Sequence, residues 1–316
     1  RESFDRDAER INEYLRDELR PSSNGAAIFA CSAERDFFEA VQFDAPIEEN
    51  HFYISYQPSV YSLARFIDHY PPYVALVADT NVAHLYVFGA GEEIEQRAVV
   101  SPNVHRTMIG GWSQARFQRR IDNIRMRHAK EVVEELDRVT REERIERIVL
   151  AGDEVIIPML REQLPQRLGE MVISTLRLDV ATPEHEVMKA SFEAVRAHDA
   201  YKDAEKVEKL LDKHLGSGFA VTGARDTLIA LTLGQVDEMF ISASEQDVRD
   251  NLTGKDAELI PGLPGDVEGN GRARSAVIAD ELVARARQTD ADVAFIEDAS
   301  RLAACGGAGA KPRFRI

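Results

Sequence analysis

The chain has 316 residues and carries 39 basic against 55 acidic side chains, a formal net charge of −16. That balance excludes a protein that coats nucleic acid with its whole surface, although it allows one local basic patch. Hydrophobic residues make up 44% of the chain and charged residues 30%, as in ordinary globular proteins. No uncharged apolar run approaches the roughly 18 residues of a membrane span, and no signal peptide is visible, so we expect a cytoplasmic protein.

Only two cysteines occur, Cys31 and Cys305, and they lie near opposite ends of the chain. No C-x-x-C pair is present to hold zinc or to carry out redox chemistry. We therefore expect inert thiols in a reducing compartment, with no disulfide framework, no metal and no cofactor.

Hydrophobic spacing predicts a small first segment that ends at the Pro71-Pro72 pair. Its expected elements are a helix over 4–19, strands over 26–31 and 37–43, and a helix through Leu63, Phe66 and Ile67.

Strands alternating with helices follow, which predicts a layered α/β domain. The expected elements are strands over 73–79, 82–88, 94–100, 148–151 and 171–178, and helices over 113–138 and 155–164.

A charged helix over 183–214 then leads into a second α/β region. Its expected strands are 219–221, 238–242, 293–296 and 313–316, and its expected helices are 224–233 and 276–288. The stretch 245–274 is rich in glycine and acidic residues, which predicts a mobile insertion.

The stretch 101–130 differs in charge from the rest of the chain, because it holds seven basic side chains against one acidic side chain, Asp122. At about 100° per residue, the arc that carries Phe117, Ile121, Ile124, His128 and Val132 is expected to face the core. The adjoining arc gathers five cations: Arg116, Arg119, Arg120, Arg127 and Lys130. Such a face, behind two glycines that approach a surface without a Cβ, suits phosphate-rich RNA; the alternative is a merely solvated helix face.

Four segments resemble one known family. Residues 110–117, Gly-Gly-Trp-Ser-Gln-Ala-Arg-Phe, are similar to the GGQ-S-x-x-R-F signature of archaeal and eukaryotic class I peptide-chain release factors. Residues 149–152, 224–234 and 306–314 resemble later segments of that family in the same order. The resemblance implies a mixed α/β fold with three domains: a small N-terminal domain over 1–72, a GGQ-like central domain over 73–182, and a third domain over 183–316 that contains the insertion 245–274.

The resemblance also implies a function. In that family the tip, here Gly110, Gly111 and Trp112, enters the peptidyl-transferase centre and promotes hydrolysis of the peptidyl-tRNA ester. The implied partners are the ribosome, peptidyl-tRNA and a translational GTPase that contacts the third domain. The five cations of the basic arc are then expected to bind RNA.

Two departures from the family limit this interpretation. The glutamine of the signature is replaced by Trp112, which keeps a backbone N–H and offers a ring for stacking on a base but has no side-chain amide; Gln114 is a possible substitute. The first segment is short and lacks the N-I-K-S motif of the stop-codon reader, so codon-specific termination is not expected. The chain most resembles the divergent bacterial branch, whose members are inferred to act in ribosome rescue.

Two other functions fit the same residues. The protein could occupy the ribosomal A site, or bind a tRNA-shaped RNA, without hydrolysis. Alternatively, residues 111–115 approximate the G-x-S-x-G nucleophile elbow of serine hydrolases, with His185, His198 or His214 as the base. That elbow requires a strand directly before the turn, and the residues before Gly110 form a poor one, so Ser113 is better explained as a helix N-cap.

Overall fold

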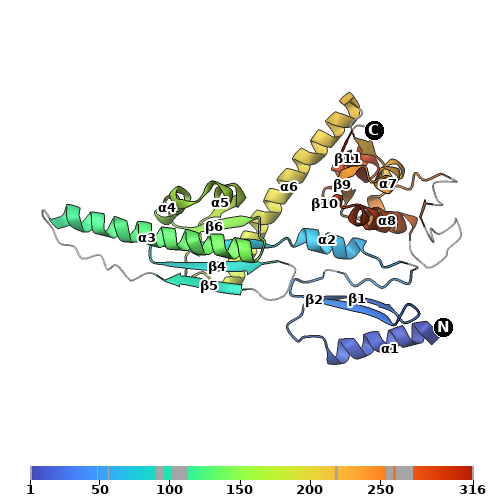
Figure 1. Cartoon of the computed structure of the whole chain (residues 1–316), viewed down its shortest axis with the longest axis horizontal. Coiled ribbons are helices and arrows are strands. Elements are labelled where there is room, and N and C mark those ends of the chain that lie inside the picture. Colours follow the sequence, from blue (N-terminus) through green and yellow to red (C-terminus); the bar gives the residue numbers. More distant parts are fainter. Residues whose placement is uncertain are drawn as a thin grey trace. The chain divides into compact units, whose positions relative to one another are not determined.

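The computed structural model describes residues 2–47, 49–55, 57–89, 95–100, 113–217, 220–253, 259–260 and 273–314; for 95–100, 113–118 and 213–217 it describes the backbone alone. Contacts divide the chain into two compact units. The first unit combines Arg1–Tyr70 with Asp199–Ile316, and the second is Pro71–His198 (Figure 1). The division into three domains stays a prediction.

The second unit is built on a five-stranded sheet in the order β5-β4-β3-β6-β7. Strands β3, β4 and β5 pair antiparallel, whereas β3, β6 and β7 pair parallel. Every residue of β3 is buried, as expected of a central strand that is covered on both faces. The strands are β3 (Tyr73–Ala78), β4 (Val82–Phe88), β5 (Glu95–Val100), β6 (Ile148–Gly152) and β7 (Val172–Leu176).

Helices cover both faces of this sheet. One face packs on α3 (Ser113–Glu142), α4 (Ile156–Gln163) and the short α5 (Gln166–Met171), which the sequence analysis missed. The other face packs on Val187 and Val195, in the first half of α6 (Glu184–Ser217).

Helix α3 buries the face that its hydrophobic spacing predicts. Ile121, His128 and Val132 are buried and Ile124 is half-buried; the side chain of Phe117 is outside the description. The buried stripe continues to Val139, so the helix is longer than expected.

The sheet of the first unit has four strands in the order β10-β9-β11-β8, with β10 parallel to β9 and β11 antiparallel to both β9 and β8. Two helices, α7 and α8, contribute most of its helical core. The elements are β8 (Val221–Thr222), α7 (Ala224–Thr232), β9 (Val236–Ser242), α8 (Arg274–Gln288), β10 (Asp292–Ile296), α9 (Ala299–Leu302) and β11 (Ala308–Pro312).

The last strand was predicted wrongly at 313–316. It begins at Ala308, because Gly306 and Gly307 make the turn before it, with φ of +64° and +83°. At Gly307 a Cβ would collide with the Asp247 carbonyl oxygen, so this position requires glycine. The strand ends at Pro312, which has no N–H to donate to a sheet.

Part of the stretch 245–274 is packed. A 3₁₀ turn spans Glu245–Asp247, and the Val248 and Ile260 side chains join the core formed by α7 and α8. Residues 254–258 and 261–272 are outside the description.

The N-terminal part of this unit has a helix, a hairpin and a second helix. Helix α1 (Glu2–Asp17) precedes the antiparallel strands β1 (Gly25–Cys31) and β2 (Phe37–Phe43), close to the predicted bounds. Helix α2 (Tyr61–His69) packs against α8 and β10.

One buried carboxylate ties α2 to α8. Asp280 of α8 accepts hydrogen bonds from the backbone N–H groups of Val60, at 2.7 Å, and Tyr61, at 2.9 Å. The Tyr61 hydroxyl donates to the carbonyl oxygen of Ser242 at 2.5 Å, and burial raises the pKa of that phenol. Asp280 therefore satisfies donors that the start of α2 leaves without intrahelical partners.

We expect Asp280→Ala to lower the free energy of unfolding by about 1–3 kcal/mol, because it leaves two backbone donors without their acceptor. Urea unfolding of the full chain measures the effect. Asp292→Ala, at an exposed position of the same unit, is the control and should change stability by less than about 0.5 kcal/mol. Equal stability of the two variants would contradict the assignment.

His128 makes the second unit sensitive to pH. Burial lowers the pKa of its imidazole, and this outweighs the charges of Asp79 and Glu131 and the hydrogen bonds to the Val82 and Asp79 backbone, which act in the opposite direction. The folded protein therefore holds the neutral ring where the unfolded chain already takes up a proton.

We expect the stability that His128 contributes to be complete above about pH 6.5 and to fall as the pH drops through the lowered pKa. His128→Gln should flatten this part of the profile of unfolding free energy against pH, since it removes the titrating group. His185→Gln, at an exposed histidine of α6, should keep the wild-type slope. A steep slope that persists in His128→Gln would assign the pH dependence to another group.

Candidate nucleic-acid interface

The predicted basic face lies on the first half of α3, opposite its buried stripe. Arg119, Arg120, Arg127 and Lys130 are exposed, whereas the side chain of Arg116 is outside the description. The part of α3 that packs on the sheet runs from Ala129 to Val139, so Arg119, Arg120 and Arg127 lie on the turns of the helix that precede this contact.

Ion pairing differs between the two halves of the helix. Within the described part of the chain, Arg119, Arg120 and Arg127 have no acidic partner, and Lys130 pairs only with Glu134, at 3.8 Å. Exposed pairs of this kind contribute about 0–1 kcal/mol, so Lys130 is readily available to another anion.

The second half of α3 uses its cations internally. Arg138 pairs with Glu135 at 2.5 Å and with Glu142 at 3.8 Å. Asp137 pairs with Arg167 of α5 and with Arg141, and hydrogen bonds from these guanidinium groups lower the pKa of its carboxyl. The unpaired cations are therefore confined to the half that adjoins the glycines.

Helix stability does not explain the cations in the first half. The amino end of a helix carries partial positive charge, which favours acidic residues there, yet the first turn of α3 has none. Residues 113–130 hold six basic side chains against one acidic one, and residues 131–142 hold five acidic against two basic. This order opposes the macrodipole, so an external anion accounts for it better than the fold does.

The predicted tip, Gly110, Gly111 and Trp112, lies outside the described residues. The chain enters this stretch from β5, which ends at Val100, and leaves it where α3 begins at Ser113. The order of elements thus puts the tip between an edge strand and the basic half of α3.

The serine-hydrolase interpretation lacks its structural context. No described strand leads directly into Ser113, which begins α3. His185 is exposed on α6 and His198 is half-buried, while the side chain of His214 is outside the description.

Cys31 and Cys305 are free thiols, and burial raises the pKa of Cys305. Among the described residues, no three or more histidine, cysteine or acidic side chains are placed to hold a metal ion. None of the described helices is both long and apolar enough to cross a membrane.

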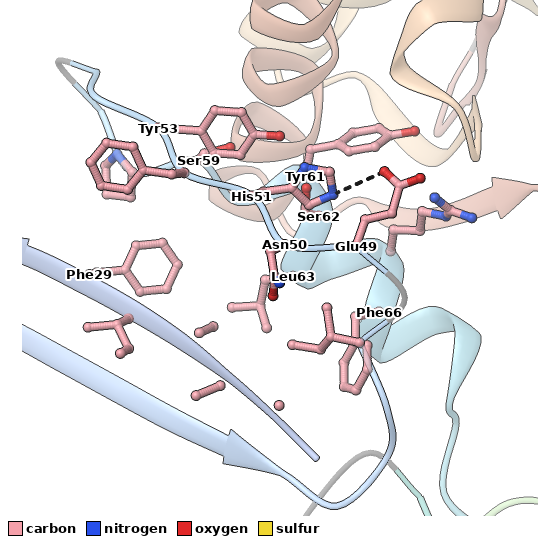
Figure 2. A pocket seen from close by; sticks show the side chains of 18 of the residues that line it. Phe29, Glu49, Asn50, His51, Tyr53, Ser59, Tyr61, Ser62, Leu63 and Phe66 are labelled. Carbon is pink, nitrogen blue, oxygen red and sulfur yellow. Dashed lines mark ion pairs between the residues drawn. The ribbon is translucent and has the colours of Figure 1, made fainter. Parts of the chain in front are cut away.

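One feature of the surface was missed by the sequence analysis. A groove of about 1320 Å³ lies in the first unit, lined by α1, β1, the segment 46–59 and α2. Figure 2 shows Phe29 of β1 facing it, with Leu63 and Phe66 of α2 on the other side. The signal that was available is the aromatic sequence His51-Phe52-Tyr53, which has the composition of a binding surface but no periodicity.

Comparisons with known proteins support the predicted resemblance. Residues 58–196 match the model of bacterial archaeo-eukaryotic release factor family 10, and no individual curated protein matches in sequence. A ribosome-bound archaeal Pelota, solved with ABCE1, is 18% identical over 77% of this chain and 62% of its own, with a TM-score of 0.50. The chain thus spans less than two thirds of that protein.

Two more distant structures match as well. Dom34 of S. cerevisiae is 11% identical over 81% of this chain and 68% of its own, with a TM-score of 0.45. The archaeal termination factor aRF1 is 16% identical over 99% of this chain and 82% of its own, with a TM-score of 0.31. The fold shared with archaeal Pelota confirms the mixed α/β class, and the family match over residues 58–196 supports the predicted resemblance to the release-factor-like superfamily.

Proposed function

We propose that the protein is a ribosome-associated release or rescue factor-like protein. The observation that carries this proposal is the cationic first half of α3, where the exposed Arg119, Arg120 and Arg127 have no acidic partner among the described residues, just after the Gly110-Gly111 pair in a chain of net charge −16. A ribosome offers dense phosphate to such a face, and the superfamily supplies the biological context. A translational GTPase is the second proposed partner, at the part of the chain that follows residue 183.

The proposed reaction is hydrolysis of peptidyl-tRNA with Gly110, Gly111 and Trp112 at the peptidyl-transferase centre. A water oxygen attacks the ester carbonyl carbon, the carbon–oxygen bond to the ribose breaks, and the tRNA oxygen takes a proton. The glycines let the backbone approach the ester closely, and the Trp112 N–H is available as a donor to the developing oxyanion. In this reaction the chain would contribute the close approach of its backbone to the ester and one hydrogen-bond donor, the Trp112 N–H.

Binding without hydrolysis is the second candidate, and Trp112 favours it. An indole orients no water through an amide, but it stacks on a base with about 1–3 kcal/mol. In this case the protein occupies the A site and leaves the ester intact. Purified protein incubated with stalled ribosome–nascent-chain complexes distinguishes the two: released peptide supports hydrolysis, and cosedimentation without release supports binding alone.

We expect the triple variant Arg119→Glu, Arg120→Glu, Arg127→Glu to lose ribosome cosedimentation while remaining folded, because the three side chains are exposed and unpaired. Its residual binding should also depend less on salt, by about 0.7–0.9 in logarithmic slope for each lost phosphate contact.

The matched control is Arg144→Glu, Arg161→Glu, Arg177→Glu, which reverses three exposed charges of the same unit outside the first half of α3. It should retain near wild-type binding. If the two triple variants bind equally well, the basic face is not the contact surface.

We expect Trp112→Ala to weaken ribosome binding by about 1–3 kcal/mol if the indole stacks on a base. Trp112→Gln should lose the same affinity, and it should release more peptide than wild type because it restores the amide of the signature. Both are measured on stalled complexes, with the melting temperature as the control. A lowered melting temperature with unchanged binding would instead assign Trp112 to a core.

A further inference from the structure

Strand β1 leaves one edge open to a partner. One edge of β1 pairs with β2, and in the described part of the chain no strand pairs with its other edge. Natural proteins protect such edges with lysine, proline or a bulge. β1, with the sequence Gly-Ala-Ala-Ile-Phe-Ala-Cys, has none of these, and its register with β2 runs without a shift from Gly25 to Cys31.

The open edge lies inside the groove of Figure 2, since every residue from Gly25 to Cys31 lines it. Exposed apolar side chains surround it. Phe52 is 71% exposed and Ile54 is 60% exposed, although both belong to the segment that forms one wall. Phe4, Leu15 and Phe37 add further exposed apolar surface to the same groove.

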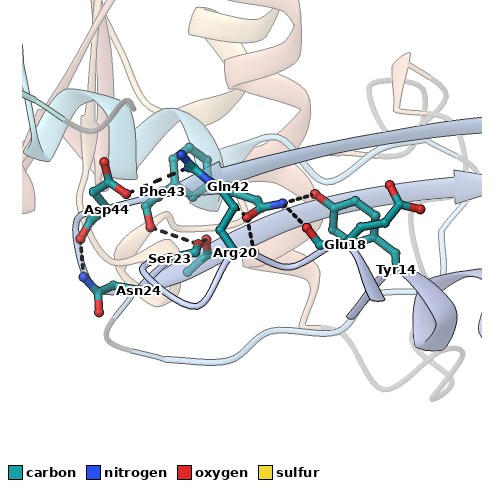
Figure 3. Close-up of polar contacts among 9 residues, drawn as sticks. Tyr14, Glu18, Arg20, Ser23, Asn24, Gln42, Phe43 and Asp44 are labelled. Atoms are coloured by element: carbon teal, nitrogen blue, oxygen red, sulfur yellow. Dashed lines mark hydrogen bonds and ion pairs between the residues drawn. The ribbon is translucent and has the colours of Figure 1, made fainter. Parts of the chain in front are cut away.

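The hairpin that carries β1 is held in place by polar contacts. Figure 3 shows Gln42 of β2 at their centre: its amide N–H donates to the Tyr14 hydroxyl at 2.7 Å and to the Glu18 carbonyl at 3.0 Å. The side-chain oxygen of Gln42, Oε1, accepts a hydrogen bond from the backbone N–H of Arg20 at 2.8 Å. α1 is thereby fixed to β2, which leaves the edge of β1 preformed and reduces the ordering cost of binding.

Charge selects the class of partner. Residues 1–70 contain 14 acidic and seven basic side chains, a net of −7. Asp7, Glu49 and Glu245 line the groove, and among its described lining residues the one arginine, Arg65, is within 3.7 Å of Glu297. Such a surface repels phosphate and attracts lysine and arginine.

The size of the groove points to a chain segment rather than a small molecule. Its volume of about 1320 Å³ exceeds the roughly 300–1,000 Å³ of small-ligand sites. A two-stranded sheet is also marginal alone, and a third strand stabilises it.

We propose that an extended, basic segment of a partner protein adds to β1 as a third strand. Its backbone pairs with the open edge, its apolar side chains pack on Phe52 and Ile54, and its cations meet the acidic rim. This N-terminal region is then a protein-docking module, separate from the RNA contact proposed for α3.

The test uses the full chain and fluorescence anisotropy. The probe is a labelled peptide with lysine alternating with valine and isoleucine, seven residues long to match β1. Its comparison probes are the same peptide with glutamate for lysine and a single-stranded RNA of about ten nucleotides. We expect binding of the lysine peptide only, and slower hydrogen exchange of the amides of Gly25–Cys31 in its presence.

The variant Phe52→Ser, Ile54→Ser should weaken peptide binding by about tenfold or more, because it removes two exposed apolar contacts. Leu233→Ser, at a 63% exposed position outside the groove, is the control and should bind normally. Four results would overturn the proposal: no binding of the lysine peptide, equal binding by both variants, preference for RNA, or self-association of the chain through β1. None of these depends on whether the protein binds ribosomes.

Discussion

The second unit depends on the packing of α3 against its sheet. The helix buries Ile121, Val132 and Leu136 on one side, and burial of such side chains contributes about 1.5–3 kcal/mol each. The same packing determines which residues remain outside. Because 3.6 residues complete a turn, a stripe that must be apolar leaves Arg119, Arg120 and Arg127 in solvent. One face of α3 therefore packs in the core of this unit, and the opposite face carries the proposed RNA contact.

The two units use buried polar groups in different ways. Asp280 is buried and accepts two backbone hydrogen bonds at the start of α2. His128 has a buried ring whose charged form is disfavoured. The first arrangement satisfies donors that would otherwise lack partners, whereas the second makes folding depend on the proton concentration.

Local pattern was enough to predict much of the fold. The short, mostly apolar runs 73–78 and 82–88 predict their strands directly, because strands that other elements cover are apolar along much of their length. The last strand was predicted at 313–316, because the connection that contains Gly306 and Gly307 was expected to continue to residue 312, whereas the strand begins at Ala308. The contact between Asp280 and Tyr61 joins residues 219 positions apart, and no local period reports such a contact.

Of the two candidate sites, one could be predicted from the sequence and the other could not. The basic arc of α3 was predicted because charge and helical spacing are both properties of the sequence. The open edge of β1 was not, because its residues are small and uncharged and read as an ordinary strand. Its significance depends on what does not pair with it, which only the sheet order shows.

Charge of opposite sign on one chain raises the question of whether the acidic surfaces cancel the basic one. The cationic half of α3 spans 18 residues, from 113 to 130, or about 27 Å at the rise of an α-helix. At physiological ionic strength the screening length is only about 8 Å. An acidic surface beyond that distance neither neutralises these arginines nor weakens their attraction to phosphate. Screening therefore makes the RNA contact proposed for α3 compatible with a net acidic chain.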